Sequence, residues 1–363
     1  MTQLKRFAPT LVLVALVLAA PVSQPRLDAR QTQTSVLSSS PFEGYLEPLR
    51  VQAGIPGMSV VIVADGEVIW ERGFGFQNLE ARIRATSDTP YPVADLSQTV
   101  AAVLLLQCVE GKKLELDTPV ERFGLSLPER GVTMRHLLSH TSSVTPGETF
   151  RYEPERFAQL TNLMEFCAPQ PYRKSVSHRI LEYLAMRDSV PGRDLQDPTA
   201  VSPDLFDPAH LQRYAGVLER LAIPYKVDKR GRATRNELPV EGINAATGLV
   251  TTARDLARFD AALDTVLLLD DTRNASWTNA TGSDQRMLPT GLGWFVQSYK
   301  GERIVWHFGL IPNAYSSLYL KIPSRRISII LLANSDGLSA PYQLQLGDVT
   351  RSLFANIFLK AFL

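Results

Sequence analysis

Cysteine is scarce in this 363-residue chain, which contains only Cys108 and Cys167. The two residues show neither the C-x-x-C spacing nor the nearby histidines of a tetrahedral zinc site, and two cysteines cannot build a disulfide framework. We therefore expect no metal and no cofactor. Cys108 fits a small buried apolar residue on a helix, and a single bridge to Cys167 stays open as the lesser alternative.

Net charge is also nearly absent, because 38 Lys and Arg residues face 37 Asp and Glu residues, a formal charge of +1. Such a balance provides no summed field to hold a polyanion or an anionic membrane face, so we expect no nucleic-acid partner. Hydrophobic residues make up 45% of the chain and charged residues 21%. This composition is far too apolar for a disordered chain and predicts a folded globular protein.

Long apolar runs are missing except near the N-terminus, where the run 11–20 follows Lys5 and Arg6. The run is about half as long as the roughly 20 residues that a spanning helix needs. We interpret residues 1–23 as a secretory signal peptide and the polar stretch 24–41 as a flexible leader. The sequence thus predicts a secreted or periplasmic protein without further membrane insertion; no clean small-x-small cleavage site follows, so an uncleaved anchor is the alternative.

The rest of the chain alternates between strand and helix patterns. The β-branched runs 58–64 and 67–73 flank Asp65-Gly66, a pair that suits a tight hairpin turn, and we expect this hairpin to open the domain. From Leu96 to Val109 the pattern is that of a helix apolar on nearly all faces, hence central and buried. Helical spacing continues in the segments 133–138, 155–167, 177–186 and 207–221.

Strand patterns return in the segments 293–299, 303–309, 317–323 and 327–334, and an apolar helix at 349–363 closes the chain. The short connections predict an antiparallel meander. We therefore expect an α/β (α+β) fold, an antiparallel sheet flanked by helices, in one domain 42–363. Its sheet lobe would span about 42–94 and 240–363, and an inserted helical lobe about 95–239.

Several segments together resemble the serine β-lactamase and penicillin-binding-protein-like hydrolases, in particular the class C β-lactamase and esterase branch. They are IPGMSVVIVADGEVIWERGFG from Ile55, YPVADLSQT before the central helix, VTMRHLLSHTSS from Val132, GLVTTARDLARF from Gly248, and WHFG from Trp306 followed by ILLANSDG. Their order and spacing carry the likeness more than any single piece. The resemblance implies a β-lactamase/transpeptidase-like fold and acyl transfer by a nucleophilic serine that a lysine activates.

The chain departs from the family pattern at the positions that carry this chemistry. The alignment puts Asp95 at the serine and Gln98 at the lysine. At the Y-x-N motif Tyr152 is kept, whereas Pro154 replaces the substrate-holding asparagine. The third motif is kept as His307, Phe308 and Gly309, and the resemblance makes the backbone N–H groups of Asp95 and Leu310 the oxyanion donors. These residues form the expected site, in which Pro154, Gly309 and Leu310 would contact a ligand.

A structural interpretation of the replaced pair competes with a functional one. The segment 95–98 fits a capping box, in which Asp95 caps the central helix and Gln98 reaches back to the cap. We prefer this interpretation. Ser97 is a poor substitute nucleophile because two residues along a helix should turn it away from the direction of residue 95.

The histidines offer little support for a metal site. His136 and His140 are four residues apart, but Leu137 stands where a zinc hydrolase has its glutamate and no third ligand is evident. We expect this segment to be the family's structural helix end, and His178 and His210 to lie at the surface or on helix flanks.

Three functions compete at this stage. We favour an exported pseudoenzyme whose cleft still binds a small-molecule or peptide ligand, such as a peptide, a cell-wall fragment or an ester. The second is a weakly active hydrolase that uses Asp95, or a water polarised by Tyr152 and His307. The third is a structural subunit that oligomerises through one of its lobes.

Overall fold

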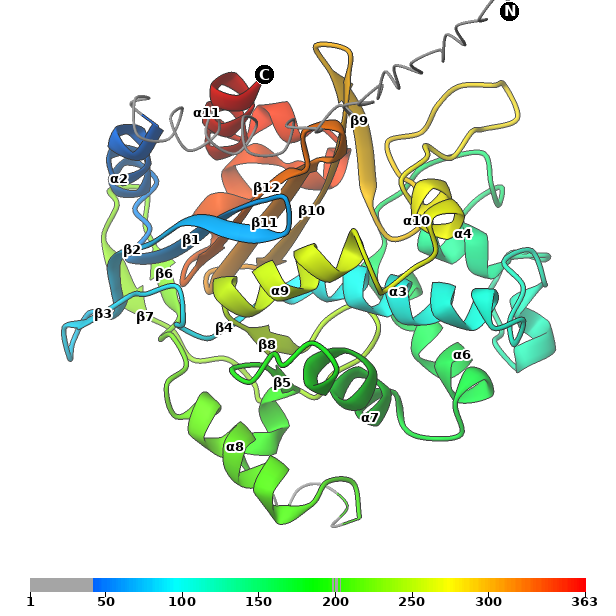
Figure 1. Cartoon of the computed structure of the whole chain (residues 1–363), viewed down its shortest axis with the longest axis horizontal. Coiled ribbons are helices and arrows are strands. Elements are labelled where there is room, and N and C mark those ends of the chain that lie inside the picture. Colours follow the sequence, from blue (N-terminus) through cyan, green and yellow to red (C-terminus); the bar gives the residue numbers. More distant parts are fainter. Residues whose placement is uncertain (1–41, 198, 200–201, 203) are drawn as a thin grey trace, which may run out of the picture.

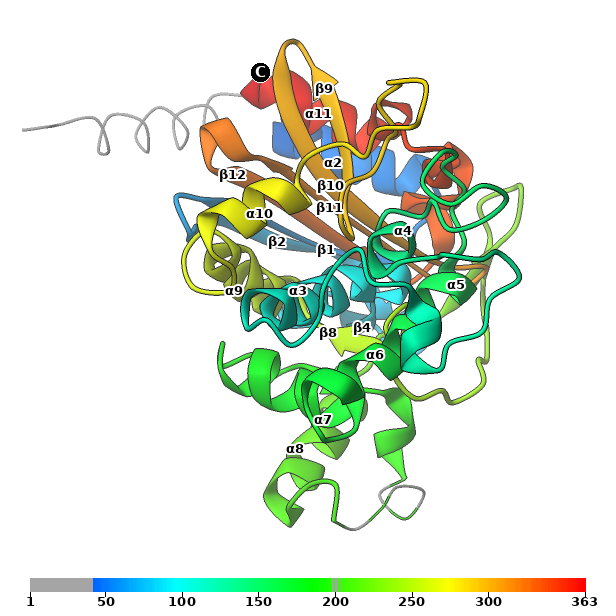
Figure 2. The same cartoon turned by 90° about the vertical axis from the view of Figure 1, so that its right-hand side faces the viewer.

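The computed structural model describes residues 42–197, 199, 202 and 204–363. The expected signal peptide and leader, residues 1–41, lie outside the described residues. The chain forms a seven-stranded antiparallel sheet with helices on both faces (Figures 1 and 2). This arrangement confirms the fold class expected from the sequence, whereas the division into two lobes stays a prediction.

The large sheet has the strand order β3-β2-β1-β12-β11-β10-β9. Its strands are β1 (Gly57–Ala64), β2 (Glu67–Asn78), β3 (Ile83–Arg84), β9 (Phe295–Tyr299), β10 (Glu302–Ile311), β11 (Tyr315–Ile322) and β12 (Ile327–Ala333). The first and last parts of the chain meet at the centre, where β1 pairs with β12 in antiparallel register. Two small sheets contain β4 (Tyr91–Pro92), β8 (Leu249–Thr251) and β5 (Val190–Pro191), and β6 (Tyr225–Val227) and β7 (Ala233–Arg235).

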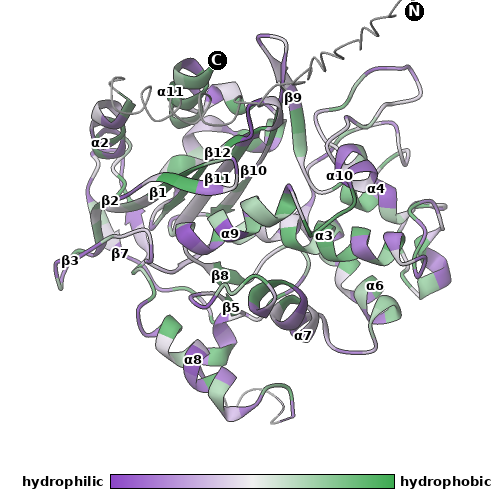
Figure 3. Ribbon diagram, in the orientation of Figure 1, coloured by the Kyte–Doolittle hydropathy of each residue, from purple (hydrophilic) through white to green (hydrophobic). Residues whose placement is uncertain are grey.

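Alternate side chains of the central strands enter two different cores. On one face, Val60 and Ile62 pack with α2 (Phe42–Gln52) and α11 (Leu353–Phe362). On the other face, Val61 and Val63 pack against the core built by α3 (Ser97–Glu110) and α9 (Ala253–Leu263). Since successive strand residues point to opposite faces, a strand covered on both sides must be apolar throughout. Hydrophobic residues accordingly concentrate in the central strands and α3 (Figure 3).

The remaining helices are α4 (Met134–Leu138), α5 (Pro154–Ala158), α6 (Leu160–Cys167), α7 (Tyr172–Val176), α8 (Pro208–Leu218) and α10 (Asp270–Ser276). The expectation that a hairpin opens the domain was wrong, because α2 precedes it. The expected helix 155–167 is two helices, α5 and α6, and the segment 177–186 begins as a π-helical turn, Ser177–Glu182, that continues α7. No helix among the described residues is both long and apolar enough to cross a membrane.

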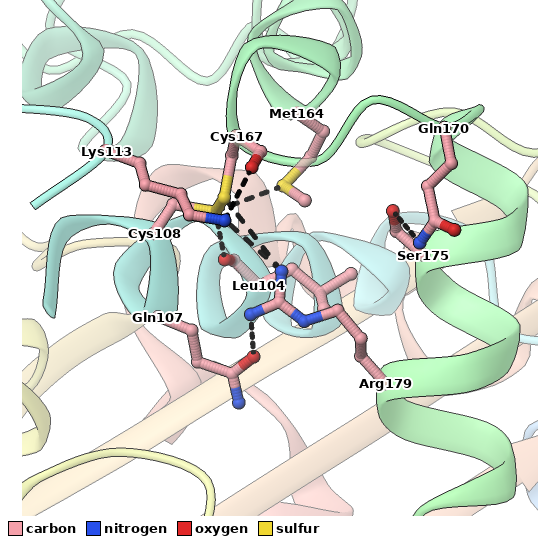
Figure 4. Close-up of a disulfide and its surroundings, with 9 residues drawn as sticks. All are labelled: Leu104, Gln107, Cys108, Lys113, Met164, Cys167, Gln170, Ser175 and Arg179. Atoms are coloured by element: carbon pink, nitrogen blue, oxygen red, sulfur yellow. Dashed lines mark hydrogen bonds between the residues drawn. A yellow bond between two sulfur atoms is a disulfide. The ribbon is translucent and has the colours of Figure 1, made fainter. Parts of the chain in front are cut away.

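A disulfide joins Cys108 of α3 to Cys167 at the end of α6 (Figure 4). Cys108 is buried on its helix as expected, but the preference against a bridge to Cys167 was wrong. The guanidinium of Arg179 lies 3.9 Å and 4.0 Å from the two sulfurs, and Lys113 Nζ donates to the Cys167 carbonyl at 3.0 Å. The bridge ties the central helix to the helical region that packs beside it.

We expect the double substitution Cys108→Ser and Cys167→Ser to lower the free energy of unfolding by about 2–5 kcal/mol, because the closed loop no longer restricts the unfolded chain. Urea unfolding with and without a dithiol reductant measures this loss. Reductant should lower the midpoint of the wild-type protein and leave that of the double variant unchanged. A wild-type midpoint that does not respond to reductant, with complete reduction verified by mass, would contradict the expectation.

Candidate active site

The site lies where the start of α3 meets strand β10. A 3₁₀ turn, Ala94–Leu96, leads directly into α3, and Ala94 has a positive φ of 51°, which is uncommon for a residue with a side chain. This turn presents the half-buried Asp95 to the strand, and Asp95 Oδ2 accepts a hydrogen bond from the Leu310 N–H at 3.3 Å. One of the two expected oxyanion donors is thus engaged by the side chain of Asp95.

Gly309 makes this close approach of strand and turn feasible. A Cβ atom on Gly309 would lie 2.0 Å from the Val93 carbonyl oxygen and 2.4 Å from Ser317 Oγ. Ser317 Oγ itself donates to that carbonyl at 2.9 Å. Any side chain at residue 309 would therefore push β10 away from the turn and separate Leu310 from Asp95.

The expected capping box at residues 95–98 is wrong. The N-cap of α3 is Leu96, and it receives no side-chain cap. Asp95 turns instead toward β10, and Gln98 is fully buried within the site. The 3₁₀ turn shifts the start of α3 beyond Asp95, so the Asp95 carboxylate is not the cap of the first free N–H groups of α3. Asp95 and Gln98 therefore form hydrogen bonds with residues outside the helix.

Gln98 is the centre of a short hydrogen-bond chain. Its Nε2 donates to the Tyr152 hydroxyl at 3.2 Å, and its Oε1 lies 2.9 Å from His140 Nε2. His140 Nδ1 accepts from the Glu153 backbone N–H at 3.3 Å. These partners assign the ring proton to Nε2, which donates to the Gln98 carbonyl oxygen. Each member of the chain is held by its neighbour in one orientation.

His140 is a site residue that the sequence analysis missed. The four-residue spacing of His136 and His140 is one that two zinc ligands on a helix can have. In the structure the two rings have different partners: His140 lies against Gln98, whereas His136 Nδ1 accepts from the Thr133 N–H as part of a helix cap. The useful signal was the segment VTMRHLLSHTSS, which placed His140 at the end of α4 without indicating that it would contact Gln98.

The aromatic and imidazole groups of the site are electrically neutral near pH 7. Burial raises the pKa of Tyr152 well above its ordinary value, and the Asp95 carboxylate raises it further. Burial lowers the pKa of His140 to about 3 and that of His307 to about 4. His307 Nδ1 donates to the Phe308 carbonyl at 2.7 Å, so this ring is also fixed. The Tyr152 ring packs against His140 and Phe308, with centroids 4.5 Å and 5.2 Å away.

Two other expected positions are accounted for by backbone contacts. The hydroxyl of the fully buried Ser97 donates to the Ala94 carbonyl at 2.7 Å and accepts from the Leu249 N–H at 3.2 Å, which leaves it turned away from Asp95 and unsuited to attack a ligand. Pro154 begins α5, a position where the missing N–H costs nothing, and its ring offers no polar group to a ligand. The histidines expected at the periphery lie there: His210 bridges Glu182 and Asp207, at 2.9 Å and 2.7 Å.

Two surface pockets lie away from Asp95. One of about 1030 Å³ lies between the β1–β2 turn and α9, and includes Trp70 and Arg254. The other, of about 550 Å³, includes His136 and Thr281. Neither pocket is lined by Asp95, and Asp95, Tyr152 and Leu310 are each only partly exposed.

Asp95 carries the most consequential electrostatic feature of the site. Burial raises the pKa of its carboxyl from 3.8 to about 7, while the N–H groups of Leu310 and of Asp95 itself oppose the shift and Glu155 adds to it. No cation is among these causes. The carboxyl therefore keeps its proton to a much higher pH than an ordinary aspartate does.

This pKa affects the stability of the protein. Because the Asp95 carboxyl binds its proton more tightly in the folded state than in the unfolded state, its contribution to the free energy of unfolding falls as the pH rises from about 4 to 7. We expect Asp95→Asn to keep the hydrogen bond from Leu310 and to gain at least about 1 kcal/mol in free energy of unfolding relative to wild type between pH 5 and pH 8. Urea unfolding at both pH values measures the gain. Asp271→Asn, which changes an exposed carboxylate of α10, is the control. A difference between wild type and Asp95→Asn that stays constant with pH would contradict the raised pKa.

Comparison with known proteins places these features in a family. The Beta-lactamase family profile matches residues 42–348. The human serine beta-lactamase-like protein LACTB, a mitochondrial protein, is 31% identical over 106 residues, which are 27% of this chain and 19% of LACTB. Protein flp of Staphylococcus aureus strain MW2 is 22% identical over 307 residues, 77% of this chain and 60% of that protein. The chain thus aligns with only part of the length of either relative.

The fold is shared with solved structures as well. The octameric penicillin-binding protein homologue from Pyrococcus abyssi superposes with a TM-score of 0.71 at 23% identity, over 88% of this chain and 76% of that one. At this identity the likeness concerns the fold alone. The profile match spans the chain from α2 through β12, and includes the turn, the central helix and the strand that build the site. The chain is a member of the Beta-lactamase family of serine hydrolase folds.

Proposed function

We propose that this chain is a catalytically silent member of the family, a pseudoenzyme that binds a ligand at the site where its relatives carry out acyl transfer. The observation that carries the proposal is the hydrogen bond from the Leu310 N–H to the Asp95 carboxylate. By the resemblance, residue 95 is the position of the nucleophilic serine and Leu310 N–H is an oxyanion donor. A carboxylate bound there competes with the negative charge that the donor would stabilise.

The remaining groups provide no substitute for the missing base. Gln98, at the position of the family's lysine, has no titrating group, and its amide is committed to Tyr152 and His140. Tyr152 holds its proton because its pKa is raised well above the ordinary value. In subtilisin, removal of the nucleophile alone costs about 10⁶ in kcat. Loss of both nucleophile and base predicts a similarly large loss here.

A weak hydrolase is the second candidate, and one observation favours it. A general base works best when its pKa lies near the working pH, and the pKa of Asp95 is about 7. In this version Asp95 takes a proton from a water molecule that attacks an ester. Its activity would rise through about pH 7 as the carboxylate forms, and Asp95→Asn would abolish it.

The two candidates also differ in what an exported protein would do with a ligand. The proposal places the chain outside the cytoplasm, on the basis of the signal-like residues 1–23. A silent site there would hold a peptide, a cell-wall fragment or an ester without converting it. The weak hydrolase would release a cleaved product.

Incubation with a fluorescent penicillin and with a chromogenic short-chain ester tests the proposal by intact mass and by absorbance. We expect the wild-type protein to form no adduct and to release no chromophore, because residue 95 carries no nucleophilic hydroxyl. We expect Asp95→Ser combined with Gln98→Lys to gain an adduct on residue 95. Adding Ser97→Ala to that variant is the control, since a true adduct on residue 95 should persist.

An adduct on the wild-type protein, or ester turnover that Asp95→Asn leaves intact, would refute the silent site. Turnover that rises through about pH 7 and disappears in Asp95→Asn would replace the proposal with the weak hydrolase. A silent wild type together with a reactive double variant would support a lost hydrolase whose other site residues are still in place.

A further inference from the structure

The charges around Asp95 point to the kind of ligand that the site can hold. The side chains of the hydrogen-bond chain and of the third family motif are neutral: Gln98 has no charge, the pKa of Tyr152 is raised, and the pKa values of His140 and His307 are about 3 and 4. The ionised form of Asp95 is therefore the charge at the centre of the site.

The flanking charges do not balance this carboxylate. Two acidic residues, Glu153 and Glu155, follow Tyr152, and Glu155 raises the pKa of Asp95. The cation near this segment, Arg156, lies 3.9 Å from the Glu153 carboxylate, and it also donates to Glu129 at 2.6 Å and to the Ser142 hydroxyl and carbonyl at 2.8 Å. Among the described residues, no Lys, Arg or His forms an ion pair with Asp95.

The ionised Asp95 carboxylate has few groups in the protein that stabilise its charge. Removing a charge from water costs several kcal/mol unless a partner charge or several hydrogen bonds compensate it. Asp95 has the Leu310 N–H and its own N–H as donors, with no side-chain donor among the described residues. By the resemblance, relatives have an uncharged serine at residue 95 and a lysine at residue 98. This chain has therefore lost a cation and gained an anion.

The aromatic ring of Tyr152 is a second feature that favours an organic cation as the ligand. Tyr152 is partly exposed beside Asp95, and its ring belongs to an aromatic cluster with Phe308 and Phe295, at centroid distances of 5.2 Å and 5.7 Å. An ammonium group is attracted to the face of such a ring. A ligand carboxylate has no such attraction to the ring and would be repelled by the negative charges of Asp95 and Glu155.

We propose that the ligand of the silent site proposed above carries a primary ammonium group, such as the N-terminus of a peptide, whose N–H groups donate to the Asp95 carboxylate while the adjoining carbon skeleton lies against Tyr152. The assignment deepens the proposed function and narrows its ligand class from esters and cell-wall fragments in general to those that present a cationic amine. A ligand whose only charge is a carboxylate is excluded by repulsion.

Three probes of one shape and different charge test this assignment: benzylamine, benzyl alcohol and phenylacetate. Isothermal titration at pH 8 with the full chain should show binding of benzylamine, with benzyl alcohol at least tenfold weaker and phenylacetate without measurable binding. Asp95→Asn should weaken benzylamine binding at least tenfold because the charge partner is lost. Asp271→Asn, the exposed carboxylate on α10, should bind benzylamine like the wild type.

Gln98→Lys provides an independent variant. It places a cation three residues after Asp95, where we expect it to pair with the Asp95 carboxylate from within the protein and to repel the ligand ammonium. We expect this variant to lose benzylamine binding and to melt at a higher temperature than the wild type. The melting temperature also verifies that the variant is folded.

The pH dependence adds a signature that a purely structural role of Asp95 would not produce. Protonation removes the charge that the amine needs, so benzylamine affinity should fall as the pH drops through about 7 and approach a tenfold loss per pH unit below it. Glu155 and Tyr152 are the titratable groups that interact electrostatically with Asp95. The other titratable groups of the site are Glu153 beside Tyr152, His140 after α4 and His307 on β10. The two histidines stay neutral over this range.

Equal binding of benzylamine by wild type and Asp95→Asn, or no binding by the wild type, would overturn the assignment. Neither outcome touches the proposed function, which depends on the absence of an acyl adduct and of ester turnover. Conversely, ester turnover by a protein that binds benzylamine through Asp95 would refute the silent site and leave the cationic ligand standing.

Discussion

The close contact between strand β10 and the turn before α3 is the constraint on which the site depends. Gly309 lies so near the Val93 carbonyl that no side chain fits, and the neighbouring Leu310 N–H reaches the Asp95 carboxylate. The contact joins the sheet to the central helix, and a residue at its centre is held by both. The side chain at residue 95 therefore lies beside the Leu310 N–H of β10.

The identity of residue 95 then determines what the site can do. A hydroxyl in this place leaves the strand N–H free for a developing oxyanion, whereas a carboxylate occupies it before any ligand arrives. Next to Asp95, three neutral side chains, Tyr152, Gln98 and His140, are linked by hydrogen bonds. These hydrogen bonds fix the orientations of the three side chains, none of which is charged near pH 7. The uncompensated carboxylate is consistent with a site that holds a cationic ligand and does not transfer an acyl group.

Much of the fold could be predicted from the sequence, for reasons that are local. The Asp65-Gly66 turn between two β-branched runs specified the β1–β2 hairpin, and short connections specified the meander β9–β12. The resemblance brought Asp95, Tyr152 and His307 into one site. The helix α2 was not predicted, and the Cys108–Cys167 bridge was only the lesser alternative. A sequence separation of 59 residues carries no local sign that two cysteines will meet.

The sequence by itself determined the order and spacing of the short segments, from which we predict the residues at the positions where relatives carry out their chemistry. Only the tertiary structure decided what the replacements do. From the sequence, Asp95 and Gln98 read as a helix cap, since capping depends on neighbours along the chain. In the fold, a 3₁₀ turn moves the helix start to Leu96, and Asp95 and Gln98 find partners at Leu310 and at Tyr152 and His140. These contacts, and the burial that raises the pKa of Asp95, arise from packing between segments more than 40 residues apart, which no local pattern encodes.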